Sequence, residues 1–204
     1  MSNTMIIKRI LNKILRDYKA FIQKYSKTCF FSIGENCLTQ NILQRHHLKT
    51  YATPYSHGRS NLDYALKLEK ENYINLLKAE YIYYDKIGEL QVVRNKHYST
   101  SDDIYSKAHQ KGFEFTHHDV ISNESHKTSY ERKVLRMQNF NKREKLKFIY
   151  HYRFSENNDL NLIIRKAEEF LSYYRKREIR CEFIFFTQKI INEQKERTVE
   201  KYMI

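Results

Sequence analysis

A cysteine directly after a glycine turn, between a strand-like run and a helix-like run, is the feature that most constrains this fold. The run Thr28–Ile33 is rich in aromatic and β-branched residues, which is typical of a strand. The residues after Cys37 place apolar side chains at three- and four-residue spacing, which predicts a helix that ends near His47. Gly34 permits a tight turn between the two, and Asn36 is a good helix N-cap. The sequence therefore predicts Cys37 in the first turn of a helix, immediately after a strand.

This position suits a reactive thiol. The free N–H groups and the dipole of a helix N-terminus favour an anion, and can lower the pKa of a cysteine from about 8.5 towards neutrality. The thiolate is the nucleophilic form. Inert packing is the alternative for any free cysteine, and it is our interpretation of Cys29 and Cys181, which lie inside apolar runs. Cys37 differs because its neighbours are Gly, Glu and Asn, so we treat it as the candidate nucleophile.

Strand-like and helix-like runs alternate along the rest of the chain. We expect strands at 79–84 and 90–94 (as a hairpin), 113–117, 146–152 and 181–187, and helices at 60–68, 124–140 and 160–175. This alternation predicts an α/β protein, a three-layer fold with a mostly parallel central sheet, and the nucleophile on the turn after the first strand.

An amphipathic segment precedes the first strand. Over Met5–Tyr25, apolar residues share one broad face and Lys or Arg residues take the other. We expect two units: an N-terminal amphipathic basic helix at 1–26 and a single α/β catalytic domain at 27–204. The helix could pack on the domain, dimerise, or lie on an anionic membrane surface through residues 5–25.

The chain is strongly basic, with a formal net charge of 37 − 24 = +13. Such a field attracts phosphate-bearing or acidic partners. We expect no nucleic-acid binding, because the positive charge is spread along the chain and no zinc-finger, RNP or glycine-rich phosphate-loop pattern occurs. Three cysteines imply no disulfide framework, and no apolar run has the length of a membrane span. These features favour a cytoplasmic protein, with peripheral contact at the inner membrane as an option.

A cysteine nucleophile needs a base, most often histidine. His46 and His47 would lie about 14 Å along the helix from Cys37, which is too far for direct contact. His117 and His118, followed by Asp119, come at the end of a predicted strand. We expect this segment to meet the cysteine turn at the carboxyl edge of the sheet, where sites form in open α/β folds. Because neighbouring strand residues face opposite ways, only one of the two histidines could approach the thiol, and Asp119 could orient it.

Other residues complete the candidate site. Backbone N–H groups around Gly34 and Cys37 could hold an oxyanion, with Asn36 as a side-chain donor or simply a turn residue. Ser32, Arg45 and Arg59 are candidates for substrate binding. A metal site at 117–119 is the rival interpretation. The alternation of faces opposes it, and no metal-ligand spacing supports it, so we expect no metal.

The motif Ser32-Ile33-Gly34-Glu35-Asn36-Cys37 resembles the opening motif of a bacterial family of papain-like cysteine peptidases. The segments Thr50–Tyr55 and Phe115–Asp119 are similar to two later motifs of that family, although Tyr55-Ser56-His57 replaces a Phe-Asp-Trp. The resemblance implies a Cys–His enzyme and favours His118 as the base. The strand–Gly–x–Asn–Cys–helix unit is also similar to the turn of SGNH hydrolases. It is similar as well to that of capsule-polysaccharide acetyltransferases, which use a Cys/His pair with acetyl-CoA.

We therefore expect a thiol-dependent acyl-transfer enzyme, either a hydrolase or an acyltransferase. The resemblance implies an acyl-bearing or glycan substrate and a role in surface-polysaccharide biosynthesis. No cofactor is required, and acetyl-CoA is a candidate acyl donor. The alternative is a non-enzymatic basic adaptor that binds an anionic membrane surface or a partner protein.

Overall fold

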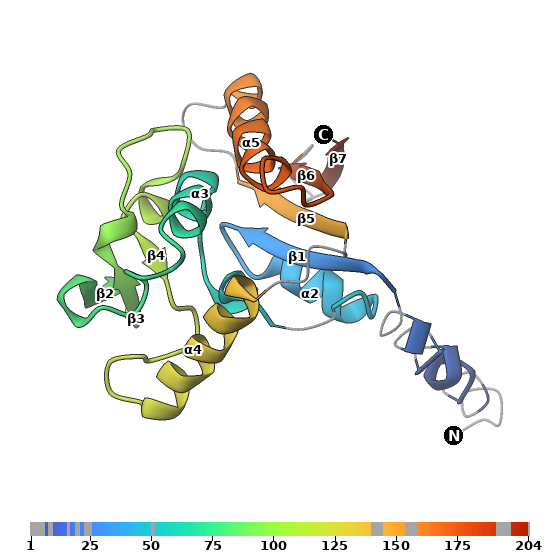
Figure 1. Cartoon of the computed structure of the whole chain (residues 1–204), viewed down its shortest axis with the longest axis horizontal. Coiled ribbons are helices and arrows are strands. Elements are labelled where there is room, and N and C mark those ends of the chain that lie inside the picture. The colour runs from blue at the N-terminus through green and yellow to red at the C-terminus, as the bar shows by residue number, and fades with distance from the viewer. Residues whose placement is uncertain are drawn as a thin grey trace.

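The computed structural model describes residues 7, 10–15, 17–18, 21–22, 26–49, 52–139, 145–153, 159–190 and 197–203. Thr50 and Tyr51 of the second motif, and most basic residues of the N-terminal segment, lie outside this set. The chain forms an α/β fold with helices on both faces of a mostly parallel sheet, as the sequence predicts (Figure 1).

The main sheet has the strand order β1-β5-β6-β7. Strands β1 (Thr28–Gly34), β5 (Lys145–Tyr152) and β6 (Cys181–Ile190) are parallel, and β7 (Arg197–Met203) is antiparallel to β6. The register sets Gly34 opposite His151, so the end of β1 lies beside the end of β5. The turn that carries Cys37 therefore lies at the carboxyl edge of the parallel strands, where α/β proteins bind ligands.

The two faces of the main sheet carry different helices. Alternate strand residues such as Phe31, Phe148 and Phe183 pair across the sheet and pack with α3 (Leu62–Lys70) and α5 (Leu160–Arg175). The opposite face packs against α2 (Leu38–Arg45) through the smaller cluster of Leu43, Ile149 and Phe186. A strand places successive side chains on opposite faces, and this alternation produces the three layers.

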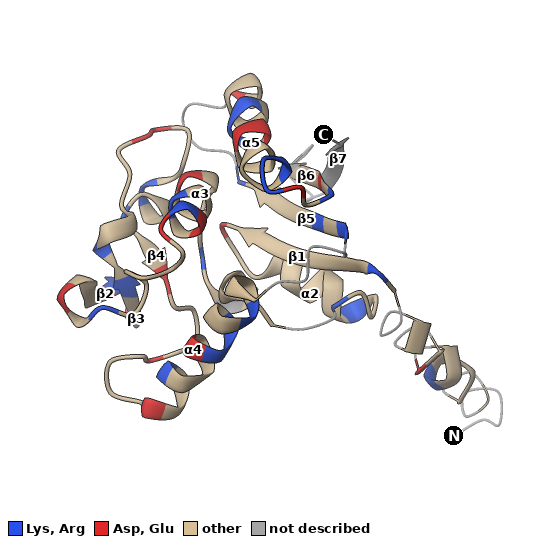
Figure 2. Ribbon diagram, in the orientation of Figure 1, with Lys and Arg blue, Asp and Glu red and all other residues tan. Residues whose placement is uncertain are grey.

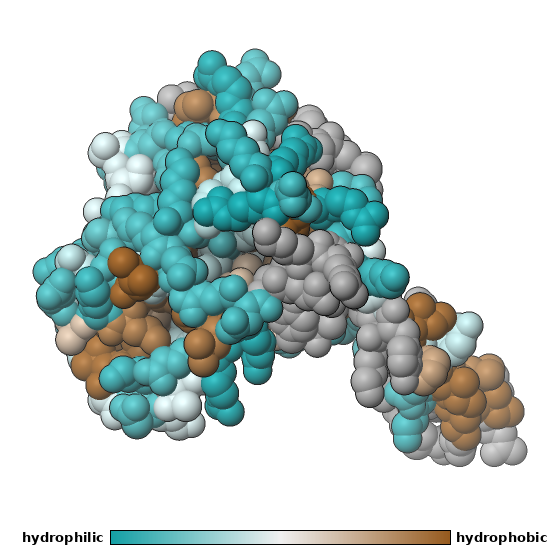
Figure 3. All heavy atoms as spheres, in the orientation of Figure 1, coloured by the Kyte–Doolittle hydropathy of each residue, from teal (hydrophilic) through white to brown (hydrophobic). Residues whose placement is uncertain are grey.

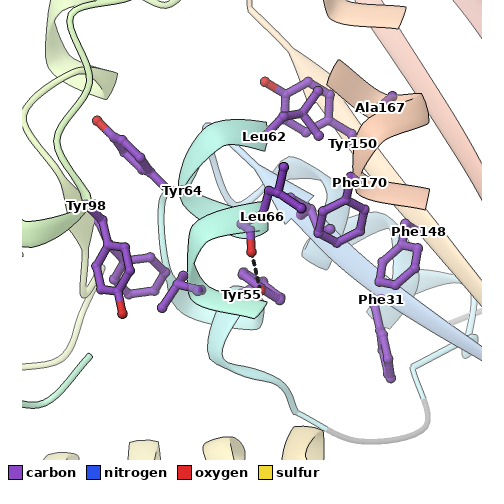
Figure 4. Packing of buried hydrophobic residues seen from close by; sticks show 14 of the residues in the cluster. Phe31, Tyr55, Leu62, Tyr64, Leu66, Tyr98, Phe148, Tyr150, Ala167 and Phe170 are labelled. Atoms are coloured by element: carbon purple, nitrogen blue, oxygen red, sulfur yellow. Dashed lines mark hydrogen bonds between the residues drawn. The ribbon is translucent and has the colours of Figure 1, made fainter. Parts of the chain in front are cut away.

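Aromatic residues fill the larger core layer. Phe148 is fully buried, with its ring centroid 5.8 Å from that of Phe31 and 4.9 Å from that of Phe170 (Figure 4). In the same view, the Tyr55 hydroxyl donates to the Ala65 carbonyl at 3.3 Å. With no Trp in the chain, these Phe and Tyr residues supply the large apolar areas that stabilise the core.

The segment between β1 and β5 contains a second, antiparallel sheet with the order β2-β3-β4. Strands β2 (Ile82–Ile87) and β3 (Leu90–Asn95) form the predicted hairpin, which turns at Gly88-Glu89, while 79–81 form a 3₁₀ helix instead of strand. Strand β4 has two residues, Phe113–Glu114. Helix α4 (Glu124–Gln138) follows it and returns the chain towards β5.

This sheet corrects one premise of the sequence analysis. The strand before His117 and His118 belongs to the small antiparallel sheet, not to the carboxyl edge of the parallel sheet. The small sheet nevertheless contacts the cysteine turn, through the segment that contains Arg59 and Ser60. Arg59 and Glu114 exchange two backbone hydrogen bonds, of 2.9 and 3.0 Å. The next residue, Ser60, donates its N–H to the Gly34 carbonyl at 3.0 Å. The residues of one strand predict that a strand forms, but not which sheet it joins.

The N-terminal segment is helical over the residues that the structure describes, and it projects away from the sheets (Figure 1). Its large apolar side chains, including Ile10, Leu11, Ile14 and Phe21, are between 50 and 61% exposed. They form a brown patch on this projecting helix (Figure 3). Among the described residues, no helix is long and apolar enough to cross a membrane.

The turn at Gly34 offers a test of how tightly β1 is joined to β5. Gly34 has φ +138°, and an added Cβ would lie 3.1 Å from Tyr150 Cδ2 and 3.3 Å from the His151 nitrogen. We expect Gly34→Ala to lower the free energy of unfolding by about 2–3 kcal/mol, from backbone strain plus crowding. Gly88, with φ +59° and open space around it, is the matched control, and Gly88→Ala should cost only about 1 kcal/mol. Equal losses in urea unfolding would contradict the crowding at Gly34.

Candidate active site

Cys37 occupies the N-cap of α2, one position before the first turn in which the sequence analysis placed it. Its φ and ψ are −79° and 3°, and its carbonyl accepts the Asn41 N–H at 2.9 Å. The thiol is half-buried. The N–H groups of the first turn of a helix have no acceptor within the helix. Cys37 therefore lies next to several backbone N–H donors. The chain reversal after β1 therefore presents the sulfur at the helix N-terminus.

Asn36 stabilises this turn. Its Oδ1 accepts the Leu38 N–H at 3.0 Å, which satisfies one donor of the first helical turn. Its Nδ2 lies 2.9 Å from Nδ1 of His151, a buried residue of β5 that stacks on Phe186 with centroids 4.8 Å apart. The structure thus shows the turn role for Asn36, and the oxyanion role stays a prediction.

Glu35 anchors the same turn in the core. Its side chain is fully buried, and the Tyr150 hydroxyl donates to its Oε1. Burial raises the pKa of Glu35 to about 8, against smaller lowering effects of Tyr150 and Arg153. Glu35 is therefore mainly uncharged at neutral pH and places no negative charge two residues from the thiol.

The electrostatic surroundings of Cys37 correct our expectation of a lowered pKa. Burial, the largest effect, raises the pKa of the thiol above its ordinary value of 9.0; Arg59 lowers it and Glu114 raises it. The thiol is therefore protonated at neutral pH in this structure. Position at a helix N-terminus does not by itself ionise a half-buried sulfur, so nucleophilic attack would need a base.

An ion-pair network fixes Arg59 and Glu114. Arg59 Nε lies 3.3 Å from Glu114 Oε1, and Arg94 Nη2 lies 2.8 Å from Glu114 Oε2. Arg94 also pairs with Asp85 through Nε at 2.9 Å. Glu114 and Arg94 are each only 1% exposed, so this network is strongly held. It positions the Arg59 guanidinium close enough to Cys37 to affect its titration.

His118 has the tautomer that a general base requires. Its Nδ1 lies 2.9 Å from the Thr116 carbonyl oxygen. A carbonyl can only accept, so Nδ1 carries the proton and Nε2 of the neutral ring has the lone pair. Burial lowers the pKa of His118 below its ordinary value of 6.5, with a smaller contribution from Lys133. The imidazole is therefore neutral at neutral pH.

Tyr130 of α4 joins the surroundings of Cys37 and His118. The Tyr130 and His118 ring centroids lie 5.2 Å apart, at 88° to each other. Burial raises the pKa of the Tyr130 phenol, and Cys37 and Glu114 raise it further. One fully buried phenol thus packs against the candidate base and interacts electrostatically with the candidate nucleophile.

His117 and Asp119 have other surroundings. His117 is exposed, with φ +63°, in a turn closed by the His118 N–H to the Phe115 carbonyl at 3.0 Å. The two histidines therefore differ by position in a turn, not by the face of a strand. The Asp119 carboxylate accepts the Tyr84 hydroxyl and the Ile121 and Ser122 N–H groups.

Those contacts, led among the lowering effects by Ser122, hold the pKa of Asp119 at about 2 despite the opposing effect of burial. The carboxylate thus organises the loop that precedes α4. An orienting contact from Asp119 to His118 stays a prediction. In the structure, the Thr116 carbonyl oxygen orients the His118 ring by its contact with Nδ1.

Ser32 and Arg45 have other surroundings. Ser32 is buried, and its hydroxyl donates to Gln40 Oε1 at 3.0 Å, which joins β1 to α2. Arg45 is exposed in the last turn of α2, about 12 Å from Cys37 at 1.5 Å per residue. In the ranges that the structure describes, no three His, Cys, Asp or Glu side chains could hold a metal ion.

Sequence reasoning missed three residues near the candidate site: Tyr130, Lys133 and Glu114. Lys133 is 3% exposed, which is unusual for a lysine. Its spacing from Tyr130 is consistent with a shared helix face, but nothing else distinguishes it among 37 basic residues. A surface hollow of about 500 Å³, lined by Lys145, Arg175 and residues 178–182, lies at the start of β5 and β6. That is the opposite edge of the parallel strands from Cys37, so we do not assign it to the site.

The comparison with known proteins gives one match. The family model described as "Putative papain-like cysteine peptidase" matches residues 28–198. No curated protein and no solved structure is significantly similar to this chain. The matched region begins at the first residue of β1 and includes the cysteine turn, the small sheet and α4.

Arg59→Gln tests the electrostatics of the thiol. Removing the positive charge should raise the pKa of Cys37 further, so less thiolate is present at pH 8. A shift of about half a pKa unit would slow alkylation of Cys37 by iodoacetamide roughly threefold. Because the pKa already exceeds 9.0, the wild-type rate should still increase with pH at pH 9. Peptide mapping separates Cys37 from Cys29 and Cys181. Arg45→Gln is the distant control, and equal slowing in both variants would contradict a local effect.

His117→Gly tests whether residue 117 serves only the turn. Glycine relieves about 1–2 kcal/mol of left-handed strain and costs about 0.5–1 kcal/mol in backbone entropy. The free energy of unfolding should therefore stay equal or increase, by about 0–1.5 kcal/mol. Glu131→Gly, at an exposed helical position of α4, should instead decrease it by about 1 kcal/mol. Loss of stability in His117→Gly during urea unfolding would show that the His117 side chain makes a stabilising contact.

Proposed function

This chain belongs to the family described as "Putative papain-like cysteine peptidase". We propose that it is a cysteine-nucleophile acyl-transfer enzyme in which Cys37 attacks an acyl carbon and His118 is the base. One observation carries this proposal. A half-buried thiol at a helix N-cap and a neutral imidazole with Nε2 as its lone-pair nitrogen share the environment of one tyrosine, Tyr130.

The protonation states support general-base activation. Both the thiol and the imidazole are uncharged at neutral pH, so the thiol proton must move as the carbon–sulfur bond forms. His118 Nε2 accepts that proton while Cys37 Sγ bonds to the acyl carbon and the carbonyl π pair moves to oxygen. The first-turn N–H groups of α2 could stabilise this oxyanion.

The cycle closes through the same two residues. The tetrahedral adduct collapses to a thioester when the leaving group departs with the proton from the imidazolium. An acceptor hydroxyl, amine or water then gives its proton to His118 and attacks the thioester, and the thiol is restored. Arg59, held by Glu114, would stabilise negative charge on the sulfur during each step.

The biological setting rests on the resemblance to acetyltransferases of capsule polysaccharides. We propose a surface-polysaccharide precursor as acceptor and acetyl-CoA as a candidate donor, with peptide hydrolysis as the rival reaction. Free cysteines suit the cytoplasm. The exposed apolar side chains of the N-terminal helix could bring the enzyme to the inner membrane, where lipid-linked glycans are assembled.

A second candidate is the non-enzymatic basic adaptor. The observation in its favour is the same projecting helix, whose apolar side chains have large exposed areas. In that case Cys37 would have no chemical role, and the experiment below would detect no adduct on it.

The test is intact-mass spectrometry after incubation with acetyl-CoA or, separately, with p-nitrophenyl acetate. We expect one acetyl group on the wild type, none on Cys37→Ala, and an unchanged yield on the matched control Cys181→Ala. An adduct from acetyl-CoA favours the transferase. An adduct from the ester alone, with Cys37-dependent cleavage of denatured casein, favours the peptidase. Equal labelling of wild type and Cys37→Ala would refute the nucleophile.

The same assay tests His118. His118→Gln should slow acylation by about 10²–10⁴-fold, the usual contribution of a general base. The wild-type acylation rate should increase as His118 loses its proton, below pH 6.5, and then stay level until the thiol itself ionises above pH 9. In the variant the rate should instead increase up to the thiol pKa, above 9.0. A wild-type profile that increases only above pH 9 would exclude His118 as the base.

A further inference from the structure

Lys133 is a buried cation without a hydrogen-bond partner. Its side chain is 3% exposed, and its Nζ makes no hydrogen bond within the part of the chain that the structure describes. The Nζ lies 3.9 Å from the centroid of the Tyr130 ring, so a cation–π contact offsets part of the cost of burial. An ammonium group held in this way still lacks the anion that would complete its environment.

Two further basic residues approach Lys133. Burial, with smaller contributions from Lys49 and Arg136, lowers the pKa of Lys133 to about 8. Burial and Arg136 likewise lower the pKa of Lys49. Arg136 is oriented by a 3.0 Å hydrogen bond from Nη1 to the Ala52 carbonyl.

None of these three cations forms an ion pair with a carboxylate in the described ranges. Two other buried or half-buried cations, Arg94 and Lys166, differ in this respect. Arg94 pairs with Glu114 and Asp85, and Lys166 pairs with Asp63 and Asp102. Figure 2 shows Lys and Arg residues along α4, on the side of the molecule that carries the cysteine turn. Within the described residues, the positive charges of the buried Lys133, the half-buried Lys49 and the exposed Arg136 are therefore not neutralised by a carboxylate.

The cluster adjoins the candidate active site. Lys133 contributes to lowering the pKa of His118, and both residues contact Tyr130. Tyr130 in turn interacts with Cys37. An anion held by Lys133 would therefore lie beside the candidate base and near the thiol.

We propose that Lys133, Lys49 and Arg136 form a subsite for a phosphate group of the substrate, next to Cys37. Because this inference names the substrate class of the same site, it rests on the proposed acyl-transfer function. Three cations match a phosphate dianion better than a single carboxylate, and phosphate accepts from lysine and arginine together. The group could belong to the acyl donor, as in CoA, or to the acceptor, as in a sugar phosphate.

The first test measures binding of inorganic phosphate to the full chain by calorimetry, at about 0.15 M salt to screen the general surface field. Lys133→Met keeps the side-chain length and removes the buried charge, a change that buried sites tolerate well. We expect it to weaken phosphate binding at least about tenfold. Arg132→Met removes the same charge from an exposed neighbour on α4 and should change the affinity by less than about twofold.

Three results would overturn the subsite. These are equal affinity in wild type and Lys133→Met, equal weakening in both variants, and no saturable binding to the wild type. The second of these would assign phosphate binding to the net charge of +13 instead of to a site.

A second arm separates the subsite from the proposed function. Cys37→Ala should bind phosphate as the wild type does, and bound phosphate should slow alkylation of wild-type Cys37. If Cys37 proves unreactive while Lys133-dependent binding persists, the subsite stands and the acyl-transfer function fails. Displacement of phosphate by CoA identifies the donor as its source, whereas displacement by glucose 1-phosphate identifies the acceptor. Phosphate that binds without protecting Cys37 would refute the placement beside the thiol.

Discussion

The candidate site depends on the buried carboxylate of Glu114. It receives Arg94 from its own small sheet and Arg59 from the segment that follows the cysteine turn. Breaking such a pair by removing one partner is strongly destabilising, because it leaves an uncompensated charge in a dry environment. The same residue forms a backbone bridge with Arg59, and Ser60 then binds the Gly34 carbonyl. Through these contacts the small sheet, with its histidine turn, is fixed against the end of β1.

Electrostatics around the sulfur explain why several chain segments must meet there. Burial alone would leave the thiol protonated and inert. Arg59 comes from the loop before α3, His118 from the turn after β4, and Tyr130 from α4. Arg59 supplies a fixed positive charge, His118 a lone pair on a neutral ring, and Tyr130 a buried aromatic surface. Helix α2 and its macrodipole supply none of these.

Local patterns predicted much of the fold. The aromatic and β-branched run of β1, the periodicity of α5 and the hairpin signal around Gly88 all correspond to observed elements. These succeed because each depends on neighbours in the sequence. The turn that carries Cys37 was predicted for the same reason, since it is encoded by Gly34 and Asn36.

Long-range features were less accessible. The assignment of 113–117 to the parallel sheet was wrong, because a two-residue strand pairs according to what tertiary packing offers it. The expectation of a lowered thiol pKa was also wrong, because burial of Cys37 raises its pKa more than the charge of Arg59 lowers it. The burial of Lys133 could not be predicted either, because nothing in the sequence distinguishes a buried lysine from the many exposed ones. Chemistry assembled from separate segments is visible only once the fold is known.

The pairing of β1 with β5 has a consequence for how the protein matures. Residues Thr28 and Lys145 are partners in the register but lie 145 − 28 = 117 positions apart in the chain. Closing so long a loop is entropically costly, and non-local contacts of this kind form late. During synthesis, β1 has no sheet to join until β5 has left the ribosome. The turn that carries Cys37 is therefore fixed in the main sheet only when most of the polypeptide has been made.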